Sequence, residues 1–252
     1  VGSEMCIRDS TQYCEKYRQW ARVTKATMRI QHKPGDAMEV DWAGATLDVH
    51  DPVTGEISKV YLFVAVLPCS CFTYAEACDD MKLENWINCH VHAYNYFGGV
   101  TRLLVPDNLK TGITKNTRAE TVLNRTYQEL SEHYNTAIVP ARVRHPKDKS
   151  HAEGGVKFAS TWILAALRDR KLFTLEEAQA AVAEKLEELN NRNFKKRPGS
   201  RREAYLEEEK DFMRPLPREP YEPAIWSPDL KVGNDYLAVS YTHLTLPTTP
   251  YV

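Results

Sequence analysis

The stretch "PGDAMEVDWAGATLDVHD" (residues 34–51) decides how the fold begins. A Pro-Gly turn signal comes first, and Met38, Val40 and Trp42 then alternate with acidic residues. Alternation with a period of two is typical of a half-buried β-strand. The stretch therefore predicts a strand that starts just after a turn and carries acidic side chains on its more polar face.

The chain after this stretch continues as a meander and then turns helical. "DPVTGE" (residues 51–56) is a hairpin-type turn, residues 57–68 are apolar and β-branched enough for a central strand, and residues 71–77 make a third strand. The next pattern predicts a helix over 83–97 ended by Gly98-Gly99 and a short strand that stops at Pro106-Asp107. A helix over 119–134 and a fifth strand over 136–143 follow. The last two predicted elements are a helix from Ser150 to about Arg170 and a helix after the N-cap candidate Thr174.

This order of elements favours one fold class. Helices that alternate with strands return the chain to parallel strands through crossovers, which gives a mixed α/β architecture. We expect the ribonuclease-H-like fold: a five-stranded mixed sheet with helices on both faces, followed by further helices and the start of a truncated β domain.

Bulk composition narrows the class of protein. With 42% hydrophobic and 27% charged residues, the chain is typical of a soluble globular protein, and no apolar run is long enough to span a membrane. Its six cysteines show no framework spacing, so a reduced, cytoplasmic protein is expected. A formal net charge of -1 means that nucleic-acid binding must rest on local basic patches.

Both ends of the chain have patterns that do not continue into their neighbours. "VGSEMCIRDS" and "YTHLTLPTTPYV" resemble translated sequencing-adapter peptides, so the natural protein is expected to be truncated at both ends. The expected domain plan, in order, is an artefact (1–10), a connector from a missing N-terminal DNA-binding region (11–33), a catalytic core (34–172), a helical extension with a basic segment (173–205), a linker and the start of a truncated C-terminal β domain (206–239), and a second artefact (240–252).

Three acidic residues occupy informative places in the expected elements. Asp41 lies within the first strand, Asp107 directly follows a strand end, and Glu153 lies near the start of a helix. Ligand-binding residues commonly lie at the carboxyl ends of sheet strands, and Mg²⁺ prefers a few carboxylates together with water and phosphate oxygens. Two such ions roughly 3.5–4 Å apart can stabilise both oxygens of an in-line phosphodiester displacement.

The flanks of these acids carry a family resemblance. "PGDAMEVDWAG", "VPDNLKTGITK" and "HPKDKSHAEGGVKF", in this order, resemble the three catalytic blocks of the IstA-type transposases, the insertion-sequence-twenty-one family of the DDE integrase superfamily. The resemblance covers about residues 11–239. It implies that Asp41, Asp107 and Glu153 bind two Mg²⁺ or Mn²⁺ ions, that DNA is cleaved at element ends, and that the 3′ ends are joined to target DNA. It further implies a helper ATPase, a homo-oligomer on DNA and a place at the bacterial nucleoid.

Each acid also has a simpler interpretation. Asp41 could be a solvent-facing strand residue, and Asp107 a turn residue after Pro106. Glu153 could form a capping box with Ser150. At the level of function, the alternatives are a non-catalytic DNA-binding remnant of a decayed element and a ribonuclease-H-like nuclease without strand transfer.

Basic residues near the acids are candidates for DNA contacts, because lysine and arginine neutralise phosphates. "RNFKKRPGSRR" (residues 192–202) has six basic residues and no acid, and it is the best candidate for a segment that follows the DNA backbone. The full set is Lys110, Lys115, Lys147, Lys149, Lys157, Arg192, Lys195, Lys196, Arg197, Arg201 and Arg202.

A cysteine and histidine cluster is the rival to the acidic site. Its spacing does not follow a paired C-x-x-C zinc pattern, and His90 fits the buried face of a helix, so structural zinc is the less favoured interpretation. The members are Cys69, Cys71, Cys78, Cys89, His90 and His92.

Overall fold

The structure is a computed structural model, and it divides the chain into two compact units, residues 1–33 and 34–252. The described residues are 11–20, 32–106, 113–116, 121–139, 146–195, 197–223, 238–240 and 244–246; side chains are not described in 113–116, 121–123, 146–154, 238–240 and 244–246. In the first unit, residues 11–20 form a helix with three exposed aromatic side chains, Tyr13, Tyr17 and Trp20.

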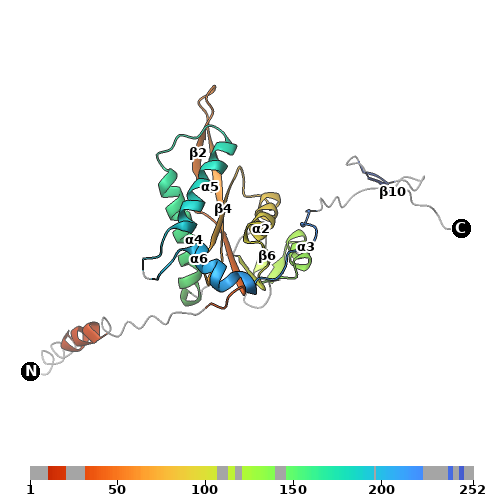
Figure 1. Ribbon diagram of the computed structural model, residues 1–252. Helices are drawn as coiled ribbons and strands as arrows, with labels where there is room; N and C mark the ends of the chain where they lie inside the picture. Colours follow the sequence, from red (N-terminus) through yellow and green to blue (C-terminus); the bar gives the residue numbers. More distant parts are fainter. Residues whose placement is uncertain are drawn as a thin grey trace, which may run out of the picture. The chain divides into compact units, whose positions relative to one another are not determined.

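A six-stranded mixed sheet forms the centre of the second unit (Figure 1). Its backbone order is β4-β3-β1-β5-β8, with β2 beside the first part of β3; β1, β5 and β8 run parallel and the other pairs antiparallel. This order confirms the ribonuclease-H-like fold class. The strands are β1 (Ala37–Trp42), β2 (Leu47–His50), β3 (Ile57–Val66), β4 (Thr73–Cys78), β5 (Leu103–Pro106) and β8 (Ala137–Ile138).

The sheet has six strands because the first expected strand is interrupted. β1 and β2 both pair with β3, and the chain between them keeps contact through the Ala43 N–H, which donates to the Leu62 carbonyl at 2.8 Å. The expected turn over 51–56 is present: the Asp51 carboxylate accepts from the N–H groups of Val53 (2.7 Å) and Thr54 (2.9 Å).

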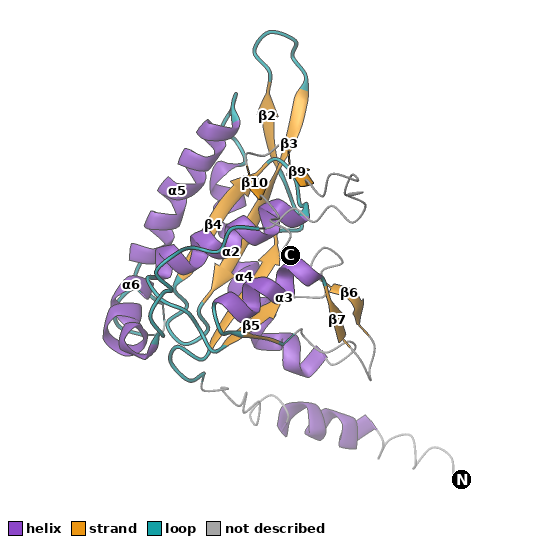
Figure 2. Ribbon diagram, turned by 90° about the vertical axis from the view of Figure 1, so that its right-hand side faces the viewer, coloured by secondary structure: helices purple, strands orange, loops and turns teal. Residues whose placement is uncertain are grey.

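Helices cover both faces of this sheet, as Figures 1 and 2 show. Helices α2 and α3 lie on one face, and α4 and α5 lie on the other. Strand β3 accordingly contributes side chains to two hydrophobic cores, one on each face of the sheet. Phe63 and Ala65 pack on the α2 side, and Leu62 and Val64 pack on the α4 side. The helices are α2 (Leu83–Phe97), α3 (Arg125–His133), α4 (Pro146–Leu167), α5 (Leu175–Asn191), α6 (Arg201–Ala204), the π-helical turn η1 (Tyr205–Glu209) and the 3₁₀ turn η2 (Lys210–Phe212).

Two helix ends match the sequence prediction. Helix α2 ends at Gly98, which adopts the left-handed conformation with φ 69°, a backbone region that costs glycine little. Helix α5 begins after Thr174, whose hydroxyl accepts from the Glu177 N–H at 3.1 Å. In both places a local side-chain or backbone rule was sufficient to predict the boundary.

Other boundaries differ from the prediction. Helix α3 begins at Arg125, six residues later than expected, because a small hairpin of β6 (Ile113–Asn116) and β7 (Thr121–Leu123) precedes it and Asn124 caps it. Strand β8 has only two residues, Ala137–Ile138. A second two-stranded pair consists of β9 (Ala238–Ser240) and β10 (Leu244–Leu246). Within the described part of the chain, no helix combines the length and the apolar character needed to cross a membrane.

Candidate active site

Asp41 lies on the middle strand of the sheet, on the face that α4 covers. Met38, Val40 and Trp42 on β1 belong to the core on the α2 side. Because successive side chains of a strand point to opposite faces, Glu39 and Asp41 point to the α4 side. The expected polar face is therefore covered by a helix, and the strand is not half-buried as its alternation predicted. The Asp41 carboxylate accepts a hydrogen bond of 2.8 Å from the Trp42 N–H.

Glu39 is a second acid on the same face, and it was not among the residues predicted for the site. Its side chain is buried, and burial raises its pKa to about 7. The signal in the sequence was its spacing, two residues before Asp41 on one strand. The surroundings on this face therefore disfavour a carboxylate charge that has no cationic partner.

Strand β5 ends beside Asp41. In the parallel register, Val40 pairs with Pro106, so the last residue of β5 lies next to the residue that precedes Asp41. Asp107 follows Pro106 in the sequence and lies outside the described residues, as does Lys110. The interpretation of Asp107 as a strand-end ligand stays a prediction.

Helix α4 starts earlier than expected, and this excludes the capping box. The helix begins at Pro146, so Ser150 is its fifth residue and Glu153 its eighth. A capping box needs its serine at the residue before the first helical turn, so the interpretation of Ser150 and Glu153 as a cap is wrong. Proline at the first helical position was the signal for the true start. The side chains of Lys147, Lys149 and Glu153 lie outside the described ones.

The same helix approaches the sheet closely just after Glu153. A Cβ placed on Gly155 would lie 3.3 Å from Cγ1 of Val66, which is tighter than ordinary contact. Val66 pairs with Glu39 in the β1–β3 register. The backbone of α4 two residues beyond Glu153 is thus packed against β3, the strand that pairs with β1 and its acidic residues Glu39 and Asp41.

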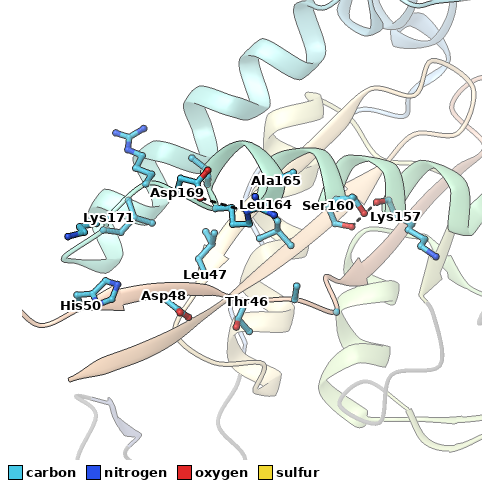
Figure 3. Close-up of a pocket in the computed structure, with 17 residues that line it drawn as sticks. Thr46, Leu47, Asp48, His50, Lys157, Ser160, Leu164, Ala165, Asp169 and Lys171 are labelled. Carbon is cyan, nitrogen blue, oxygen red and sulfur yellow. Dashed lines mark hydrogen bonds and ion pairs between the residues drawn. The ribbon is translucent and has the colours of Figure 1, made fainter. Parts of the chain in front are cut away.

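A groove of about 810 Å³ runs between β2 and the second half of α4 (Figure 3). Lys157 and Ser160 lie at one end and His50 and Lys171 at the other. Lys157 is exposed and follows Glu153 by about one helical turn. Other lining residues are Gly44, Ala45, Thr46, Leu47, Asp48, Thr161, Leu164, Ala165, Leu167, Arg168, Asp169, Arg170 and Leu172.

The basic segment 192–202 is partly used inside the protein. Arg197 forms an ion pair of 2.8 Å with Glu208, and Arg202 forms one with Glu187. The guanidinium of Arg201 lies over the rings of Phe158 (5.3 Å) and Phe194 (5.1 Å). Arg192 and Lys195 are exposed, whereas Lys196 lies outside the described residues and Lys115 is described only in its backbone. Basic content alone did not separate the structural arginines from the exposed residues.

The cysteine and histidine cluster does not form one site. Cys69 and Cys71 belong to the turn between β3 and β4, whereas Cys78 and Cys89 are in contact with each other. His90 is a core histidine, as expected: its Nδ1 donates to the Trp86 carbonyl at 2.6 Å, its Nε2 accepts from the Tyr127 hydroxyl at 3.2 Å, and burial lowers its pKa to about 4. The tautomer follows because a carbonyl oxygen can only accept.

Known proteins share the sequence around these residues. Residues 31–146 match the family model described as the integrase core domain. The chain is 41% identical over 238 residues to a protein of Sinorhizobium fredii named as a putative transposase (94% of this chain, 46% of that protein). It is 42% identical over 226 residues to one of Pseudomonas fluorescens named as a putative transposase for insertion sequence IS1162 (90% and 40%). The chain thus spans less than half the length of these two relatives.

More distant similarity extends to a transposase for IS21 of Pseudomonas aeruginosa, 27% identical over 244 residues (92% of this chain, 60% of that protein). A chain of a simian T-cell lymphotropic virus intasome has the same fold, with a TM-score of 0.52 and 13% identity (79% of this chain, 60% of that chain). The fold is therefore shared well beyond the range in which the sequences are clearly alike.

Proposed function

We propose that this chain is the catalytic region of a DNA transposase that cleaves DNA at element ends and transfers the 3′ ends to target DNA. One observation carries the proposal. Asp41 lies on the central strand at the point where β5 ends, because Val40 and Pro106 are register partners. Asp107 is the residue that follows Pro106 in the sequence.

The residues of this site fit hard divalent cations. Asp41 supplies a carboxylate fixed by a central strand, and Asp107 and Glu153 supply two more in the proposed triad. Glu39 adds an acidic group two residues from Asp41 on the same face. We propose Mg²⁺ or Mn²⁺, two ions, which would stabilise charge on the attacking and leaving oxygens of the phosphodiester.

Basic residues around the triad would hold the DNA. Lys157 lies one turn after Glu153 at the end of the groove, where it can reach a phosphate of a strand whose scissile bond is at the acids. Lys147 and Lys149 on α4, and Lys110 and Lys115 after Asp107, belong to the same proposal. Within 192–202, the exposed Arg192 and Lys195 are the better candidates.

The partners follow from this function and from the resemblance to IstA-type transposases. They are the element ends, target DNA, further copies of the chain on DNA, and a helper ATPase of the same element, with the bacterial nucleoid as the place of action. The proposed domain plan assigns residues 34–172 to the catalytic core. Residues 11–33 and 206–239 would connect it to a preceding DNA-binding region and a following β domain.

The test is Mg²⁺-dependent strand transfer on DNA that carries element ends. Asp41→Asn, Asp107→Asn and Glu153→Gln should each lower the rate by orders of magnitude while DNA binding is retained. Asp211→Asn, a change of an exposed acid in η2, is the matched control and should leave the rate unchanged. Cleavage without joining would indicate a nuclease, and binding without either reaction would indicate a non-catalytic remnant.

A further inference from the structure

A ladder of side chains joins β4 to α2 on the side of the sheet away from Asp41. Tyr74, Glu76 and Cys78 alternate along β4 and share one face, while Cys89 and His92 lie three residues apart on α2. The rungs are Cys78 with Cys89 (Sγ–Sγ 3.3 Å) and Glu76 with His92 (Oε2–Nδ1 2.9 Å). The ladder therefore brings together a Glu-x-Cys strand pattern and a Cys-x-x-His helix pattern.

Among the described residues, the ligand atoms of Glu76, Cys78 and Cys89 all lie within 4.8 Å of one another. We propose that these three residues bind Zn²⁺ and that His92 completes the coordination. Thiolate ligands favour zinc over magnesium, so this site is distinct in chemistry from the acidic site. It is distinct in place as well, because Asp41 points to the α4 face of β1 and this cluster lies on the α2 face of β4.

The distances favour a metal over a disulfide. Two thiolates bound tetrahedrally at about 2.3 Å from zinc are about 3.8 Å apart, so the sulfurs at 3.3 Å would separate by about 0.5 Å. A disulfide of about 2.05 Å would require an approach of more than about 1 Å. The Glu76–His92 separation of 2.9 Å is likewise near the roughly 3.3 Å expected of two ligand atoms about 2.0 Å from one ion.

Burial and hydrogen bonding suit a site that opens at one side. Cys78 and Cys89 are buried, whereas the side chains of Glu76 and His92 are 20% and 51% exposed. Glu76 and His92 thus lie on the solvent side of the buried thiols. The Tyr74 hydroxyl donates to Glu76 Oε2 at 2.8 Å and fixes the carboxylate, as the outer partners of metal ligands commonly do.

Metal binding would be coupled to proton release. The hydrogen bond with Cys78, followed by burial, holds the pKa of the Cys89 thiol well above its ordinary value. Zinc must therefore displace the Cys89 proton to bind this residue as thiolate. Bound zinc would also connect the edge strand β4, which carries Glu76 and Cys78, to helix α2, which carries Cys89 and His92.

The experiment is a Co²⁺ titration of the reduced, metal-free full chain, followed by competition with Zn²⁺. We expect a thiolate-to-cobalt charge-transfer band that saturates at about one ion per chain and that Zn²⁺ abolishes. Replacing both thiols, Cys78→Ser together with Cys89→Ser, should remove the band. Glu76→Gln, which keeps an acceptor for Tyr74, should weaken Zn²⁺ binding about 10–100-fold or more without loss of fold.

Two controls separate this site from other metal binding. Cys14→Ser removes an exposed thiol of helix 11–20 and should leave the band unchanged. Asp41→Asn should leave the bound zinc unchanged even if it abolishes strand transfer, so the two proposals can fail independently. The proposal is overturned if the wild-type chain gives no charge-transfer band, if the variant that lacks both Cys78 and Cys89 thiols retains it, or if mass spectrometry finds Cys78 and Cys89 joined as a disulfide in protein kept under reductant.

Discussion

Glu209 and Gly35 are 174 residues apart in the sequence, and the Glu209 carboxylate accepts a hydrogen bond of 3.2 Å from the Gly35 N–H. Its other oxygen accepts from the Ser70 N–H at 3.0 Å. The π-helical turn η1 is thereby attached both to the turn before β1 and to the turn between β3 and β4. The segment after α6 thus stabilises the base of the strand that carries Asp41.

Glu209→Gln should destabilise the protein although it preserves size and shape. Glu209 is buried and offers one oxygen to each of two backbone donors. The amide would point its NH₂ group at one of those donors and leave that N–H unsatisfied, a loss of about 1–3 kcal/mol. Urea unfolding measures this, with Glu207→Gln, a change of an exposed neighbour, as the control. Equal midpoints for the two variants would contradict the role of Glu209.

Gly35→Ala should be more damaging still. Gly35 has φ +65°, and a Cβ there would lie 2.5 Å from the Phe212 carbonyl oxygen. Backbone strain of about 1–2 kcal/mol adds to a contact that η2 must move to relieve. Gly44→Ala is the matched control, because a Cβ placed on Gly44 would meet nothing within 4 Å and its φ is not positive. We expect Gly44→Ala to stay within about 0.5 kcal/mol of the parent in thermal unfolding.

His90 should make stability depend on pH in acid. Its folded pKa of about 4 lies below the ordinary value of 6.5, so well above pH 6.5 both states are neutral and its full contribution is present. As the pH falls toward 4, the unfolded state takes up a proton that the folded state excludes, and stability is lost. By about pH 5 this loss reaches about 2 kcal/mol.

His90→Gln should flatten that part of the profile, even if its stability at pH 7 is lower. The measurement is the unfolding free energy at a series of pH values, with a chelator present so that no metal at Cys89 or His92 contributes. A variant with the same acid slope as the parent would assign the slope to other groups.

Capping and periodicity rules predicted the boundaries of elements whose ends are determined by neighbouring residues. They failed for elements whose boundaries are determined by contacts with residues far away in the sequence. The Gly98 end of α2 and the Thr174 start of α5 follow from the backbone freedom of glycine and the hydroxyl of threonine. The hairpin before α3 has strands of three and four residues in a polar stretch, too short to show alternation. The break between β1 and β2 depends on pairing with β3.

The candidate sites likewise include residues that local sequence patterns identified and residues that only the packing of distant elements brings together. Asp41 was identified through its flanking residues and its resemblance to a catalytic block, and its face of the sheet follows from strand alternation. Glu76 was missed as a partner of Cys78 and Cys89 because a two-residue strand spacing and a three-residue helix spacing meet only after β4 and α2 pack. The capping-box interpretation of Glu153 failed because a serine three residues before a glutamate also fits inside a helix.

The salt dependence of DNA binding should distinguish the arginines of 192–202. Replacing the exposed Arg192 and Lys195 by Ala should lower the slope of log affinity against log salt by roughly 0.9 for each lost phosphate contact. Arg202→Ala, by contrast, removes the ion pair with Glu187 and should leave the slope unchanged. Binding measured across a salt series tests both. A slope that responds to Arg202 and not to Arg192 or Lys195 would reverse the assignment.

Glu153→Gln should separate catalysis from folding. Glu153 lies in the second turn of α4, away from the cap positions, and glutamate and glutamine have similar helix propensities. The unfolding free energy should therefore change by less than about 0.5 kcal/mol. If Glu153 is the third ligand proposed above, the change removes one negative ligand for a hard cation. Charge stabilisation by bound metal contributes several kcal/mol to such reactions, so Mg²⁺-dependent strand transfer should fall by orders of magnitude. Thermal unfolding and strand transfer are measured on the same preparation, with Glu188→Gln on the exposed face of α5 as the control. Strand transfer at the parental rate in the Glu153→Gln variant would mean that another residue completes the acidic site.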